Sequence, residues 1–291
     1  MSALVAVGSF LTRKEAYGVN RAMLLREVEY ARPASVGDAV RLLTEHDGAR
    51  ALAGGQTLVN VMKARAASPD VLVDLNGLDE LKGIELGSDG TLEIGAMTTC
   101  TEIVESAEAR ARAILGEVCA QIADVQVRNR GTIGGNVCSN DPTNHLPPLM
   151  VALGATMTIR GVDGERTVPA EEFFLGVYMT AAGPGELLMK VTVPAGKGDG
   201  FASLPIGRDG TCIVNVAASL DGGAPRVVIG CVDAVPVLVR PEAAEDDAVR
   251  GAVRAAGLQP PDDVHASAEY RRHLAEVLAA RAVRAAKERA S

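Results

Sequence analysis

The sequence has no tryptophan, and aromatic residues make up only 3% of its 291 positions. Proteins that hold single-stranded nucleic acid stack its bases on aromatic side chains, and duplex binders need a basic surface that neutralises phosphates. Basic residues are also in deficit, because the formal net charge is −8. We therefore expect no nucleic acid among the partners, and we expect cores built from aliphatic side chains.

Cysteines are few and widely spaced: Cys100, Cys119, Cys138, Cys212 and Cys231. Their odd number argues against a disulfide framework, and no Cys-x-x-Cys or cysteine–histidine spacing points to a bound metal ion. An iron–sulfur cluster is disfavoured for the same reason, since its thiolate ligands come in closely spaced groups. We expect small buried thiols, as in a protein of the reducing cytoplasm.

Long hydrophobic runs are missing as well. No segment approaches the roughly 20 apolar residues that a membrane-spanning helix needs. The short apolar run in "MSALVAVGSFLTRKEAY" has no basic residue ahead of it, which does not fit a signal peptide. We expect no membrane span and a cytoplasmic location.

Length and composition favour a globular protein of two domains. Apolar residues account for 47% of the chain and charged residues for 23%, which is typical of folded domains, and this length suits two of them. Residues 1–24 carry little pattern and are predicted to be an N-terminal extension. The stretch "VPAGKGDG", residues 193–200, combines proline, glycine and charge and marks a boundary. The expected domains are residues 25–196 and residues 197–291.

The first domain opens with an α/β pattern, because residues 27–55 predict a strand, a helix, a second strand and a glycine loop. Ser35 can cap the helix, with Asp38 three positions later. One apolar face of this helix is formed by Val36, Ala39, Val40 and Leu43. A short helix is expected directly after the glycines, at residues 57–65, and a buried strand at residues 69–75.

From residue 83 onward the pattern is that of an α+β protein. Residues 83–97 and 156–168 each alternate in two runs about a turn, which predicts two hairpins with helices between them. Beyond the boundary, residues 212–232 predict a strand pair and residues 267–290 a helix. The residues of this helix expected on its apolar face are Tyr270, Leu274, Val277, Leu278 and Ala282.

Two glycine clusters are the main candidates for a binding site: "AGGQT", Ala53 to Thr57, and "TIGGN", Thr132 to Asn136. Glycine admits positive φ and lets another group come close, so successive N–H groups can converge on one anion. The first cluster also precedes a predicted helix, whose N-terminal N–H groups favour an anion. Each cluster could cradle a phosphate or form only a turn. Neither matches G-x-G-x-x-G or a P-loop, which disfavours a nicotinamide-binding Rossmann fold and an NTPase.

Five stretches together carry a family resemblance: "LAGGQTLVNVMKAR", "LEIGAMTTCTEI", "VRNRGTIGGNVCSNDP", "PGELLMKVTVP" and "DDVHASAEYRRHLAEVLAARAV". In this order they resemble the FAD-binding medium subunits of the xanthine dehydrogenase and carbon monoxide dehydrogenase family. The likeness runs from about Glu27 to the C-terminus. No single motif identifies this family, but the five together are specific for it.

The resemblance implies an α+β fold in which a two-subdomain FAD-binding domain of the vanillyl-alcohol oxidase (PCMH) type precedes a small antiparallel sheet with packed helices. It implies FAD as the cofactor, with its pyrophosphate held by the two glycine clusters. The residues that would hold it are Ala53, Gly54, Gly55, Gln56, Thr57, Thr132, Gly134, Gly135 and Asn136. The segment from Gly95 to Thr98 would line the flavin pocket, and Leu188 would pass near the ring. No catalytic residue is assigned.

The sequence departs from the family near the expected flavin. Many relatives carry a cofactor-binding acid where His145 stands; an imidazole can still hydrogen-bond, and the nearby Asp141 could partly substitute. The alternative for His145 is a surface residue that caps the next helix. Some relatives place a lysine near the flavin where Pro205 stands, and Arg208 is the candidate for that charge. A stacking aromatic has no counterpart near Cys212, so we expect flavin reactivity to differ more than FAD binding.

Three functions follow as hypotheses. The resemblance implies a molybdenum hydroxylase subunit that passes electrons from iron–sulfur clusters through FAD to an external acceptor. Its partners would be a molybdopterin-containing large subunit and a 2Fe–2S small subunit. The departures from the family motivate a second hypothesis, a free-standing FAD-dependent oxidase or dehydrogenase acting directly on a small molecule. The third is an interaction module that kept the fold and lost FAD.

Overall fold

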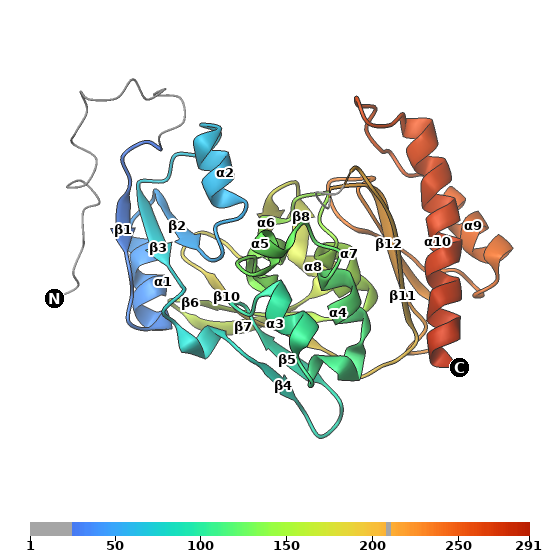
Figure 1. The fold of residues 1–291 in the computed structure, drawn as a ribbon, viewed down its shortest axis with the longest axis horizontal. Coiled ribbons are helices and arrows are strands. Elements are labelled where there is room, and N and C mark those ends of the chain that lie inside the picture. Colours follow the sequence, from blue (N-terminus) through green and yellow to red (C-terminus); the bar gives the residue numbers. More distant parts are fainter. Residues whose placement is uncertain (1–24, 208–210) are drawn as a thin grey trace.

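The computed structural model describes residues 25–207 and 211–291. They form three blocks in chain order: a small parallel sheet, a five-stranded antiparallel sheet covered by helices, and a four-stranded antiparallel sheet backed by two helices (Figure 1). The α+β class is confirmed. The expected extension at residues 1–24, with its short apolar run, and Arg208 lie outside the described residues.

The first block contains β1 (Glu29–Ala31), α1 (Val36–Glu45), β2 (Ala49–Leu52), α2 (Leu58–Lys63) and β3 (Val71–Asp74). Its strands run parallel in the order β1-β3-β2. Oγ of Ser35 caps α1 by accepting from the N–H of Asp38 at 3.1 Å, and the predicted apolar face is the buried one. The strand–helix–strand prediction is confirmed, and it leaves the first glycine cluster at the carboxyl end of β2.

The second block is a sheet with the strand order β4-β5-β10-β6-β7. Its strands are β4 (Ile84–Leu86), β5 (Leu92–Gly95), β6 (Thr156–Gly161), β7 (Gly164–Pro169) and β10 (Leu187–Val193). Both predicted hairpins are present, β4 with β5 and β6 with β7, and β10 pairs between them. A separate two-stranded ribbon joins β8 (Phe174–Gly176) to β9 (Met179–Thr180).

Short helices cover this sheet (Figure 1). They are α3 (Cys100–Glu105), α4 (Ile114–Cys119), α5 (Val125–Arg128), α6 (Ile133–Ser139), α7 (Leu146–Ala152) and α8 (Ala170–Phe173), with 3₁₀ turns at Asp79–Leu81 and Ala109–Arg112. Every residue of α7 is buried, because the helix packs against the third block on one side and the core of the central sheet on the other. A helix that is apolar on all sides is stable only in such an interior position.

The third block contains β11 (Asp199–Pro205), β12 (Cys212–Ser219), β13 (Arg226–Gly230) and β14 (Val237–Val239), with α9 (Asp246–Ala255) and α10 (Ala268–Ala290) packed on its outer face (Figure 1). The predicted strand pair and the C-terminal helix are confirmed. The apolar face of α10 is partly wrong, because Tyr270 is 45% exposed. Arg271 is buried in its place, since its guanidinium donates to the carbonyl of Ile213 at 2.5 Å and to Asp263 at 2.6 Å.

The cysteines are free thiols, four of them buried and Cys138 half-buried, which confirms the expectation of small core thiols. Within residues 25–207 and 211–291, no helix combines the length and the apolar content needed to cross a bilayer.

A buried ion pair joins the second block to the third. The guanidinium of Arg112 donates to both carboxylate oxygens of Asp199, at 2.6 and 2.7 Å, and both side chains are 2% exposed. The same guanidinium donates to the carbonyl of Pro194 at 2.5 Å and lies 3.1 Å from the carboxylate of Asp221. Bidentate pairs between arginine and a carboxylate are stronger than hydrogen bonds between neutral groups. Here the pair fixes the first residue of β11 to the 3₁₀ turn before α4.

Removing one partner of this pair should destabilise the protein strongly. Asp199→Asn leaves the Arg112 guanidinium buried without its counter-charge, and such losses cost about 3–5 kcal/mol of unfolding free energy. Urea denaturation of the variant measures this. The control is Arg284→Ala, whose pair with Asp246 is 58% and 46% exposed and which should shift the midpoint little. Equal shifts for the two variants would contradict a structural role for the buried pair.

Candidate functional site

The two glycine clusters meet in the fold although they are far apart in the sequence. A Cβ added at Gly54 would lie 1.9 Å from the carbonyl oxygen of Arg130, so the two backbones are in a contact that only glycine permits. On the same surface, a Cβ added at Gly135 would lie 3.5 Å from Cβ of Ala53. The loop after β2 and the start of α6 therefore form one continuous surface.

The first loop carries backbone donors that the protein does not use. Within the described part of the chain, the four N–H groups from Gly54 to Thr57 donate to no protein acceptor. Gly55 has a φ of 74°, a left-handed conformation that glycine adopts without strain, and it turns the chain into α2. Nδ2 of Asn76 donates to the carbonyl of Ala53 at 3.1 Å and holds the loop in place. The loop therefore has a run of donors available to an anion.

The donors of the second cluster are already in use. Gly134 donates its N–H to the carbonyl of Ala96 at 2.9 Å, and Gly135 donates to Oγ1 of Thr132, the capping residue of α6, at 3.0 Å. A Cβ at Gly134 would lie 2.6 Å from the same Ala96 oxygen. The second cluster therefore offers a closely packed glycine surface rather than the set of free N–H groups expected from the sequence.

Asn136 carries an unsatisfied polar atom beside this surface. Its Oδ1 is buried and has no hydrogen-bond partner among the described residues, while its backbone carbonyl accepts from Asn144 Nδ2 at 3.0 Å. An unpaired buried acceptor costs about 1–3 kcal/mol. A ligand with hydroxyl or amide donors, such as a dinucleotide, would relieve that cost.

The residues expected near the flavin form a layer next to the second cluster. Gly95 ends β5, and a Cβ there would lie 2.4 Å from a backbone oxygen. Thr98 is 1% exposed and its hydroxyl donates to the carbonyl of Gly83 at 3.0 Å. Leu188 lies on β10 and is 5% exposed. Ala96 joins this layer to the glycine cluster through its hydrogen bond with Gly134 and to β10 through its own N–H.

Asp141 and His145 lie away from the glycine contact, at the junction with the third block. The carboxylate of Asp141 accepts from the hydroxyl of Tyr178 at 3.0 Å. Burial, and then the hydrogen bond to Asp141, raise the pKa of Tyr178. The ring of His145 is 3% exposed and contacts the Cys212 thiol of β12, so the alternative of a surface residue capping α7 is wrong. Pro205 is exposed at the end of β11.

Sequence reasoning missed the polar group that braces the first loop. Asp74 ends β3 and is 6% exposed; it accepts from the hydroxyl of Tyr30 and from Asn76 Nδ2. Burial raises the pKa of Asp74, but the hydrogen bonds from Tyr30 and Asn76 outweigh it and leave the pKa below its ordinary value. Asn76 also accepts from Arg130 at 3.3 Å, so it links the first cluster to the segment just before the second. An acid and an amide directly after a buried strand, in "VLVDLN", were the available signal.

Comparison with known proteins places these features in a family. The family model described as the FAD binding domain in molybdopterin dehydrogenase matches residues 26–196. The carbon monoxide dehydrogenase medium chain of Afipia carboxidovorans is 38% identical over 297 residues, covering 92% of this chain and 99% of that one. The nicotine 6-hydroxylase medium subunit of Paenarthrobacter nicotinovorans is 33% identical over 280 residues, covering 90% and 98%.

The likeness extends to three dimensions. A chain in the structure of carbon monoxide dehydrogenase from Hydrogenophaga pseudoflava superimposes with a TM-score of 0.85 at 36% identity, covering 92% of this chain and all of that one. Sequence and fold therefore agree over nearly the whole length, and FAD is the cofactor of the matched domain. The chain belongs to the family of FAD-binding domains found in molybdopterin dehydrogenases.

Proposed function

We propose that this chain is the FAD-binding subunit of a molybdenum hydroxylase and passes electrons from the iron–sulfur clusters of a partner through FAD to an external acceptor. It is thus an FAD-dependent oxidoreductase of the electron-transfer kind. The observation that carries the proposal is the contact of Gly54 with Arg130, which sets a loop with free N–H groups against a glycine-lined helix start.

FAD suits this arrangement, and we assign its contacts as follows. The N–H groups from Gly54 to Thr57 would bind the pyrophosphate, and Asn76 holds Ala53 in place behind them. The side of the FAD site that faces this loop would consist of Thr132, Gly134, Gly135 and Asn136. Gly95, Thr98 and Leu188 would line the flavin pocket. When bound, FAD supplies the redox chemistry, and the chain itself binds and orients it.

Two of the candidate cofactor-binding residues, Asp141 and His145, lie away from the contact between the glycine clusters. We assign Asp141 and His145 to the flavin end, because the segment that carries them follows α6 directly and is tied to Asn136 through Asn144. The uncharged Pro205 sets this chain apart from relatives with a lysine, so flavin reactivity differs from theirs. These assignments concern cofactor contacts and give no residue a catalytic role.

The domain organisation follows the same division. We propose an FAD-binding domain at residues 25–196 and a C-terminal domain at residues 197–291. A separate apolar core supports the second, because β12, β13 and β14 pack there against α9 and α10. Free buried thiols suit a cytoplasmic location, which we also propose.

The partners we propose are a molybdopterin-containing large subunit and a small subunit with 2Fe–2S clusters. Full-length relatives are named medium chain and medium subunit, which implies companions of other sizes. The five dispersed cysteines of this chain lack the spacing of cluster ligands, so the clusters must come from another chain. A free-standing oxidase is less favoured, because the relatives that match over the whole chain are subunits of larger enzymes.

Native mass spectrometry of the protein purified gently from its own host tests the proposal directly. We expect a complex that contains this chain, one FAD, a larger subunit and a smaller subunit. The chain alone with FAD would favour the free-standing enzyme and would make a direct substrate screen the next step. The chain alone without FAD, even after incubation with the cofactor, would overturn the assignment of both glycine clusters.

Gly54→Ala tests the contact between the loops. The new methyl group meets the Arg130 carbonyl, so the loops separate and the FAD affinity falls by at least about tenfold, since one charge-assisted hydrogen bond is worth about 1.5–3 kcal/mol. Flavin absorbance and fluorescence titration measure the affinity. The control is Gly37→Ala in α1, where the nearest atom to a new Cβ is 3.8 Å away and FAD binding should not change.

Asn136→Leu separates cofactor binding from folding. Removing the unpaired Oδ1 should leave the apo protein as stable or more stable, whereas the FAD affinity falls by about tenfold, the worth of one hydrogen bond near 1.4 kcal/mol. Thermal denaturation of apo protein and FAD titration give the two readings. Gln259→Leu, at an exposed position in the C-terminal domain, is the control. An unchanged FAD affinity would remove Asn136 from the site.

A further inference from the structure

A cluster of two thiols and a histidine lies outside the glycine contact. His145, the residue before α7, has its ring nitrogens 3.7 and 3.8 Å from Sγ of Cys212 at the start of β12. Nδ2 of Asn215, three residues further along β12, lies 3.3 Å from Nδ1 of that ring. All three side chains are buried, so the thiol and the imidazole contact each other in an interior of low polarity.

Cys231 completes the cluster from the neighbouring strand. The register places Asn215 opposite Gly230, so Cys231 leaves β13 at the end of the sheet where β12 begins. It does so with a φ of 66°, which is rare for a residue other than glycine. The hydrogen bond from Cys231 is the largest cause that lowers the pKa of Cys212 to about 5, against burial and with help from His145, and the same bond raises the pKa of Cys231. Cys212 therefore loses its proton more readily than a free thiol, whereas Cys231 keeps its own.

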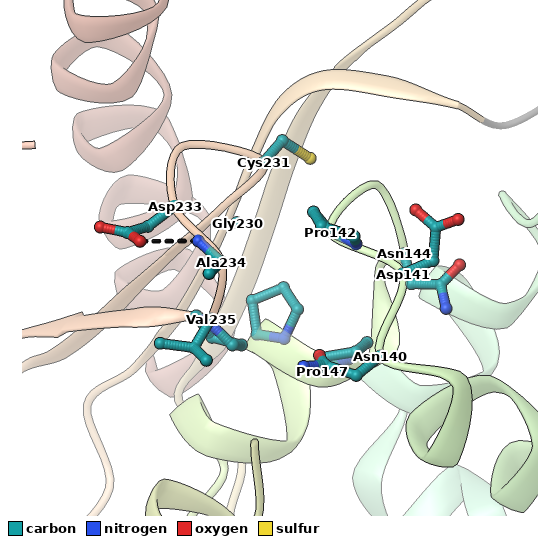
Figure 2. A pocket seen from close by; sticks show the side chains of 12 residues that line it. Asn140, Asp141, Pro142, Asn144, Pro147, Gly230, Cys231, Asp233, Ala234 and Val235 are labelled. Atoms are coloured by element: carbon teal, nitrogen blue, oxygen red, sulfur yellow. Dashed lines mark hydrogen bonds between the residues drawn. The ribbon is translucent and has the colours of Figure 1, made fainter. Parts of the chain in front are cut away.

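A narrow pocket borders one thiol of this pair, Cys231. Cys231 borders it together with the turn at Asp233 and Ala234, and the segment with Asp141 and Asn144 forms the facing side (Figure 2). Figure 2 shows the Cys231 sulfur directed away from Asp233. The space admits a molecule about the size of water. A small peroxide can therefore approach where bulky thiol reagents are excluded.

The chain contains a second thiol pair for comparison. Cys100 and Cys119 are also buried and hydrogen-bonded, and Cys119 lowers the pKa of Cys100 against burial, with help from the charge of Arg128. Neither borders the pocket of Figure 2. The pocket beside Cys231 and the histidine contact of Cys212 therefore distinguish this pair from an otherwise similar one.

We propose that Cys212 and Cys231 form an oxidation site at which a small peroxide converts the two thiols to a disulfide, with His145 holding the transferred proton. The Cys212 sulfur attacks the peroxide: an S–O bond forms, the O–O bond breaks, and the proton held by His145 leaves with the second oxygen as water. The Cys231 sulfur then attacks the sulfenic sulfur: an S–S bond forms, the S–O bond breaks, and the Cys231 proton leaves with the hydroxyl as a second water. The thiols lose two electrons and two protons, and the peroxide gains them.

The purified flavoprotein, treated with graded hydrogen peroxide, then alkylated under denaturing conditions and digested, tests the site. We expect a peptide that links Cys212 to Cys231, an intact-mass loss of about 2 Da, and reversal by dithiothreitol. Cys100 and Cys119 should remain alkylated at the same dose. If Cys212 and Cys231 stay alkylated at doses that oxidise methionine, or if the Cys100–Cys119 pair links first, the proposal is wrong.

Two variants assign the order of the steps. Cys231→Ser should stop at a sulfenic acid on Cys212, which dimedone traps when it is added together with the denaturant, because the second thiol is gone. Cys119→Ser, the matched control in the other pair, should leave the Cys212–Cys231 link unchanged. The absence of sulfenic acid on Cys212 in this variant would exclude Cys212 as the attacking sulfur. The wild-type peptide map decides the proposal even if a variant fails to fold.

Discussion

The candidate site depends on how closely the backbone at Gly54 approaches the carbonyl of Arg130. No side chain fits between them, so the loop after β2 and the start of α6 are held at backbone distance. Everything that packs behind this contact preserves it. Asn76 bonds to both sides, Asp74 fixes Asn76, and Tyr30 fixes Asp74 from the edge strand β1. The parallel sheet of the first block therefore holds the loop after β2 in its position.

The two glycine clusters look alike in sequence and do different work. In the first, the glycines leave N–H groups free for a ligand. In the second, the corresponding groups bind Ala96 and Thr132, and the glycines matter because they remove bulk. Substitutions should therefore have different consequences: in the loop after β2 they would move the free N–H groups away from a ligand, and at the start of α6 they would displace the packed backbone itself. Two clusters with similar sequences can thus differ in role: one provides hydrogen-bond donors, and the other provides a surface without side chains.

Elements with local signals were predictable from the sequence. The cap at Ser35, both hairpins and the C-terminal helix follow from patterns within a few residues, and the structure has them. Features that depend on residues far apart in the sequence were not predictable. Tyr270 has apolar spacing but faces solvent because Arg271 finds acceptors inside, and His145 is buried because β12 packs over it. At the site, the clusters were visible in the sequence, but which of them has free donors depends on Ala96, a residue with no chemical signal of its own.

Helix α7 has a consequence for how the protein folds. Because it is buried on every side, it belongs at once to the core of the central sheet and to the wall of the C-terminal sheet. Neither sheet can lose its structure without exposing this helix, and the Arg112–Asp199 pair adds a charged link between the same two blocks. Cooperative units are defined by such shared interiors. The central sheet and the C-terminal sheet are therefore one folding unit, and the segment that carries Asp141 and His145 is only as stable as the sheet that follows it in the chain.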